Sequence, residues 1–125
     1  MCVAQLKPME NVKLDQGQLE TLYRQLGPVG ADKVVNHALE ELASLLARLP
    51  ADYGAAEMSA LSDGARALAA VAQQVGMTKL ARVARDVSDL APRHDSNALG
   101  AVMARLERIG DRSLAAVWDI ADQSV

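Results

Sequence analysis

The sequence contains no phenylalanine, one tryptophan and two tyrosines, although half of its 125 residues are apolar. The core must therefore be built from leucine, valine and a large number of alanines. Alanine has the highest helix propensity, lets neighbouring helices approach closely and is depleted in strands. This composition argues against a β-rich fold and indicates one all-α domain.

Cysteine, excess positive charge and long apolar runs are also scarce. The one cysteine, Cys2, cannot form an internal disulfide, which suits a reducing compartment. The formal net charge of −3 argues against a nucleic-acid binder whose affinity comes from counterion release. No run approaches the ~20 apolar residues of a membrane span, and the first residues lack a signal-peptide h-region. We expect a cytoplasmic protein that binds neither nucleic acid nor membrane.

Apolar periodicity divides the chain into a flexible lead-in, residues 1–13, and a single helical domain, residues 14–125. Asp15 is a candidate N-cap for a short first helix that ends at Gly27. The second helix is predicted over residues 31–49, ending before Pro50. These helices and the three that follow predict an antiparallel up-down-up-down four-helix bundle with an additional short N-terminal helix.

The third predicted helix has apolar residues spaced alternately three and four apart, and Gly76 ends it through a positive φ. Its inward seam is Met58, Leu61, Ala65, Leu68, Ala72 and Val75. A fourth helix ends at Ala91-Pro92, and one long last helix continues across Gly110. The candidate N-caps of these three helices are Asp52, Thr78, and Asp95 or Ser96.

The segment from Val75 to Arg82, VGMTKLAR, is similar to part of the signature of histidine-containing phosphotransfer (HPt) domains of bacterial phosphorelays. That signature is a helix bearing HxxKG, then a glycine, then a helix containing Leu-Ala. The resemblance covers about residues 15–121 and implies an HPt-like helical bundle. Counting back ten residues from Gly76 places the family histidine at Arg66, its lysine at Ala69 and its glycine at Ala70.

Position 66 lies beside the seam of the third helix, so its side chain is expected to point to solvent. Arginine keeps its proton and offers no nucleophilic lone pair, so no catalytic residue is assigned at this position. The resemblance then implies a protein that docks a receiver domain or a histidine kinase without transferring phosphate. The expected docking face is Ser62, Asp63, Arg66, Ala67, Ala69, Ala70 and Gln73. The simpler interpretation of Arg66 is a surface arginine paired with Asp63 at i, i+3.

His37 is the alternative phosphoacceptor. A hairpin centred near Pro50–Tyr53 would place it level with Arg66, giving an imidazole and a guanidinium on neighbouring helices. The simpler interpretation is a partly exposed helix histidine, and His94 is expected to be a solvated loop residue.

No other pattern indicates an enzyme, a cofactor or a metal site. Two histidines and one cysteine make no convincing zinc site, and no H-E-x-x-H is present. Acidic residues interleave two basic rows, which predicts a salt-bridged solvent face. A monomer is favoured over an oligomer. The alternative function is that of a purely structural or oligomerisation helical bundle. The basic rows are Lys79, Arg82 and Arg85, and Arg105, Arg108 and Arg112.

Overall fold

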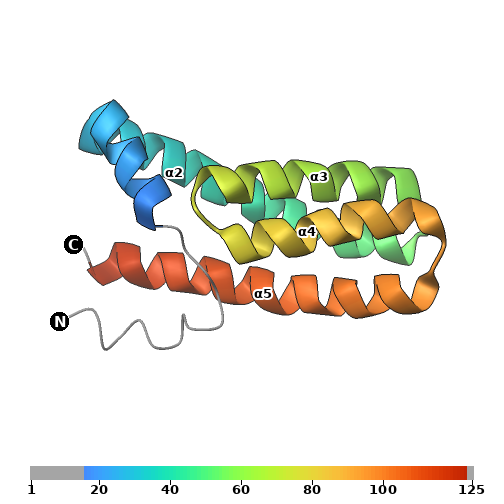
Figure 1. The fold of residues 1–125 in the computed structure, drawn as a ribbon. Helices are drawn as coiled ribbons and strands as arrows, with labels where there is room; N and C mark the ends of the chain where they lie inside the picture. Colours follow the sequence, from blue (N-terminus) through green and yellow to red (C-terminus); the bar gives the residue numbers. More distant parts are fainter. Residues whose placement is uncertain (1–15, 124–125) are drawn as a thin grey trace.

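The computed structural model describes residues 16–123, with side chains over residues 17–116. Every regular element in that part of the chain is helical, which confirms the all-α prediction (Figure 1). None of these helices is long and apolar enough to cross a membrane. The elements in chain order are α2 (Gln16–Gly54), α3 (Met58–Gln74), α4 (Thr78–Leu90), the short 3-10 helix η2 (Ala91–Arg93) and α5 (Ser96–Gln123). The expected lead-in, the Asp15 cap and the side chains after residue 116 lie outside the described part.

α2 is one element with a sharp kink at Gly27, where φ is 74° and ψ is 169°. Glycine tolerates this backbone conformation, and Pro28 then restarts the helix without needing a hydrogen-bonded N–H. The chain before Gly27 bends away from the rest of α2 (Figure 1). The predicted end before Pro50 is wrong, because α2 continues to Gly54. Proline removes one backbone donor, but its φ suits a helix and the following turn closes with Ala55 N donating to Ala51 O.

A side-chain hydrogen bond spans the kink. The Tyr23 hydroxyl donates to Asp32 Oδ1 at 2.6 Å. This bond, followed by partial burial and the negative charge of Asp32, raises the pKa of Tyr23 above its ordinary value of 10.0. The neutral phenol is the form that donates, so deprotonation would break the bond and leave two anions facing each other.

We therefore expect Tyr23 to ionise above pH 10 in the folded protein, and Asp32→Asn to lower its midpoint. A raised folded-state pKa contributes stability that is complete below the ordinary pKa and is lost as pH rises through the folded value. Tyrosinate absorbance in a Tyr53→Phe background, which leaves Tyr23 as the one tyrosine, measures the midpoint. An unchanged midpoint in the Asp32→Asn variant would contradict the assignment.

The turns before α3 and α4 share one hydrogen-bonded design. At the end of α3, Gly76 has φ 81° as predicted, with Gly76 N bonded to Gln73 O and Met77 N to Ala72 O. At the end of α2, Ala56 takes the same left-handed conformation, with φ 58°. Both are Schellman turns, in which the last two N–H groups fold back onto the helix carbonyls.

Two predicted caps are wrong because these turns are so tight. The residue that closes each Schellman turn, Glu57 or Met77, is also the N-cap of the next helix, and neither makes a side-chain capping bond. Asp52 lies inside α2 and Thr78 is the first residue of α4. The prediction of Asp95 is confirmed, because its Oδ1 accepts from Ala98 N at 3.1 Å.

α3 is the central element of the fold and contacts both α2 and α4. Its predicted seam is buried from Leu61 to Val75, with Met58 partly buried. α5 contacts α4 and α2 and is continuous through Gly110, as expected. Gly64 and Gly110 mark close approaches to α2, because a Cβ at either would lie within 3 Å of a leucine side chain. The small side chains of the core thus bring the helices together as the composition indicated.

Candidate functional site

An exposed strip runs along α3 beside its buried seam. The seam residues Leu61, Ala65 and Leu68 fix the rotation of the helix, and the strip follows on the solvent side. It carries one acidic, one basic and one amide side chain with two alanines between them, so a partner can approach the backbone closely. Its members are Asp63, Arg66, Ala67, Ala70 and Gln73.

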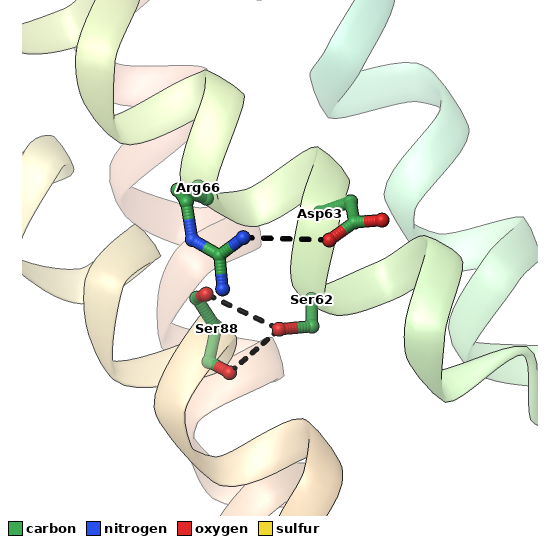
Figure 2. A network of polar contacts seen from close by, with 4 residues as sticks. All are labelled: Ser62, Asp63, Arg66 and Ser88. Atoms are coloured by element: carbon green, nitrogen blue, oxygen red, sulfur yellow. Dashed lines mark hydrogen bonds and ion pairs between the residues drawn. The ribbon is translucent and has the colours of Figure 1, made fainter.

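Two residues expected on this strip are buried instead. Ser62 is 8% exposed and Ala69 is 4% exposed. Ser62 faces α4, where its hydroxyl donates to Ser88 O at 2.8 Å and lies 3.3 Å from Ser88 Oγ (Figure 2). The correction has a simple cause: α3 packs between two helices, so it buries a wider arc than a single seam.

Arg66 is the most prominent side chain of the strip. Its Nη1 lies 3.4 Å from Asp63 Oδ1, and both side chains are more than two-thirds exposed (Figure 2). The i, i+3 pair considered from the sequence is therefore present. A contact this long and this exposed is worth only tenths of a kcal/mol, so the guanidinium can exchange it readily for a partner's carboxylate.

A groove of about 440 Å³ begins at Arg66 and continues to the turn that follows α4. α3 forms one wall, and Pro92 and His94 form the other. His94 is exposed in the turn after η2, as expected from the sequence, but its place beside the groove was not predicted, because a loop histidine has no helical period to assign it a face. Its nearest signal was the polar segment PRHDSN between two helices. The α3 residues lining the groove are Met58, Ser59, Ser62, Asp63 and Arg66.

His37 is not level with Arg66, contrary to the expected hairpin register. Gly64 lies against Leu49, so Arg66 is level with about residue 47, and His37 is on the order of 15 Å further along the axis. The register is displaced because α2 extends past Pro50. His37 instead borders a separate groove of about 310 Å³ with Val71 and Gln74, and its Nε2 lies 3.5 Å from Glu41 Oε1. The structure does not bring the two candidate groups together.

The five arginines of the basic rows do not form the expected salt bridges with the side chains that the structure describes. Arg82, Arg85, Arg105, Arg108 and Arg112 are exposed, and none of them has an ion pair within the side chains that the structure describes. Acidic neighbours in the sequence are thus solvated rather than paired. The same part of the chain contains no group of three His, Cys, Asp or Glu residues that could hold a metal ion.

No protein-family model matches this chain, and no curated protein or solved structure matches it either. The fold and the site define this chain as an all-helical protein with an exposed strip on α3 that carries Arg66, and a groove that adjoins this strip.

Proposed function

We propose that this chain is an HPt-like signalling module that docks a receiver domain, or a histidine kinase, in the cytoplasm without transferring phosphate through position 66. The observation that carries the proposal is the place of Arg66. The Val75–Arg82 resemblance assigns it the family's phosphoacceptor position, and its side chain is exposed on α3 beside a groove.

The proposed architecture is an antiparallel up-down-up-down bundle that begins after Gly27, with the chain before Gly27 as a short additional helix. The short connections support this proposal, because three residues join α2 to α3 and three join α3 to α4. Short connections favour antiparallel neighbours. The left-handed backbone at Gly27 separates the two parts of α2.

The proposed chemistry is recognition of carboxylates. A receiver domain carries its phosphorylated aspartate in an acidic pocket, and the guanidinium fork matches carboxylate geometry with two parallel donors. The small side chains of Ala67 and Ala70 leave room beside that contact. Arg66 would therefore occupy the pocket that a phosphotransfer histidine enters, and it would bind there without reacting.

Two alternatives differ from this proposal in the residues they need. Phosphotransfer through His37 would need a phosphate-binding cation beside the imidazole. Lys33 lines the same groove, but the contact that the imidazole makes is with Glu41, whose carboxylate would repel a phosphate. An oligomerisation module would need exposed apolar surface, and Tyr23, Leu26 and Val29 provide some around the α2 kink. That surface lies on the kinked part of α2, so self-association there is separable from docking at Arg66.

A binding screen against the receiver domains encoded in the same genome tests the proposal. Each receiver is presented with and without phosphorylation, and a parallel assay measures acid-labile phosphohistidine on the chain. We expect at least one receiver to bind and no label to form. Label that disappears in His37→Ala would support the relocated phosphoacceptor, and failure of every receiver to bind would leave a structural role.

A further inference from the structure

The groove beside Arg66 joins two parts of the chain that are distant in sequence. Arg66 comes from the middle of α3, whereas His94 follows η2 at the start of the connection to α5. Both line the same groove, so a group that entered it would meet a guanidinium on one wall and an imidazole on the other. Met58 and Pro92 give the groove an apolar portion.

A left-handed backbone conformation at the end of η2 places His94 in the groove wall. Its φ is 60° and its ψ is 24°, values that asparagine, aspartate and histidine adopt more often than other residues with a side chain. The imidazole has no hydrogen bond or ion pair with the described side chains, whereas His37 lies beside Glu41. Of the two histidines in the described part of the chain, His94 is therefore the one whose imidazole makes no such contact.

The charges around His94 favour an anionic ligand. The other charged side chains lining the groove are Asp63 and Arg66, which offset each other. Of its neighbours in the turn, Arg93 is exposed, and Asp95 directs Oδ1 to Ala98 N in the cap of α5. A protonated imidazole therefore makes the groove positive.

We propose that His94 is a second cationic contact of the docking site and binds a carboxylate of the receiver domain together with Arg66, more tightly when the imidazole is protonated. The inference rests on the proposed function and deepens it, because it identifies the groove as the place where the partner's acidic side chains lie. An imidazole gains its charge on acidification within the range of pH 5 to 8, which makes docking sensitive to pH.

The test compares His94→Asn with wild type. Asparagine tolerates the left-handed conformation, so the variant keeps the turn and removes only the titrating charge. His37→Asn is the matched control, because it removes an exposed histidine that lies outside the groove. The affinity of all three proteins for a receiver domain that bound in the screen is measured at about pH 6 and about pH 8.

Wild type and His37→Asn are expected to bind roughly three- to tenfold more tightly at the lower pH than at the higher. The His94→Asn protein is expected to lose this gain and to bind with the same affinity at both pH values. An equal pH response in His94→Asn and wild type overturns the role of His94 and leaves the proposed function standing. Absence of receiver binding by wild type at both pH values overturns both.

Discussion

The Arg66→Glu variant is expected to lose receiver binding, with an affinity at least about a hundredfold below that of wild type. A docked guanidinium would be desolvated among the partner's carboxylates, and replacing it with a carboxylate substitutes repulsion for attraction at that point. The side chain is 70% exposed in the free protein and its one ion pair is long. The melting temperature is therefore expected to stay essentially unchanged.

Arg108→Glu is the matched control for this experiment. Arg108 is an exposed arginine on α5, away from the groove, and its replacement makes the same change in net charge. Binding measured by calorimetry should be lost in Arg66→Glu and retained in Arg108→Glu. Equal affinity of Arg66→Glu and wild type would remove the basis of the proposed docking face, whereas equal weakening of both variants would indicate attraction by overall charge alone.

The Gly64→Ala substitution is expected to lower the free energy of unfolding by about 1–2 kcal/mol. A Cβ at this position would lie 2.8 Å from Leu49 Cδ2 and 3.1 Å from Arg48 Nη2. Leu49 is completely buried, so it has no free space into which to move. The clash outweighs the roughly 1 kcal/mol that alanine gains over glycine in helix propensity. Urea unfolding followed by circular dichroism measures the change.

Gly110→Ala provides an internal comparison for this prediction. Its Cβ would lie 2.7 Å from Leu46 Cδ2, but Leu46 is only partly buried and its side chain can rotate away. The gain in propensity then offsets most of the clash, and we expect a change within about 1 kcal/mol of wild type. If both variants lose the same stability, the burial of the contacted leucine is not what decides the cost.

The sequence predicted helix faces better than it predicted helix ends. The seam of α3 was correct because leucine and alanine repeat with the helical period, and Gly76 was correct because a positive φ favours glycine. The end of α2 was predicted wrongly, because proline stops a helix only where the loss of its backbone hydrogen bond cannot be tolerated. Four further residues after Pro50 displaced the whole register of α2 against α3.

The candidate site was predicted only in part, for two physical reasons. Small residues such as Ser62 and Ala69 carry little information about burial, so a helix between two neighbours hides more of its surface than its leucines indicate. His94 reaches the groove through the path of a turn, which no helical period encodes. Arg66 and Asp63 were placed correctly because both lie on the face of a regular helix that its buried seam leaves exposed.

The burial of Ala69 bears on whether phosphotransfer chemistry could be built into this helix. Matching the resembled motif would require Arg66→His, Ala69→Lys and Ala70→Gly. The imidazole would enter an exposed position without difficulty. The lysine would start from a site that is 4% exposed, so its ammonium would have to extend along the helix to reach water or displace its neighbours. The packing around Ala69 therefore separates the substitutions: a histidine at position 66 fits the surface as it is, whereas a lysine at position 69 would require the interior of the protein to open.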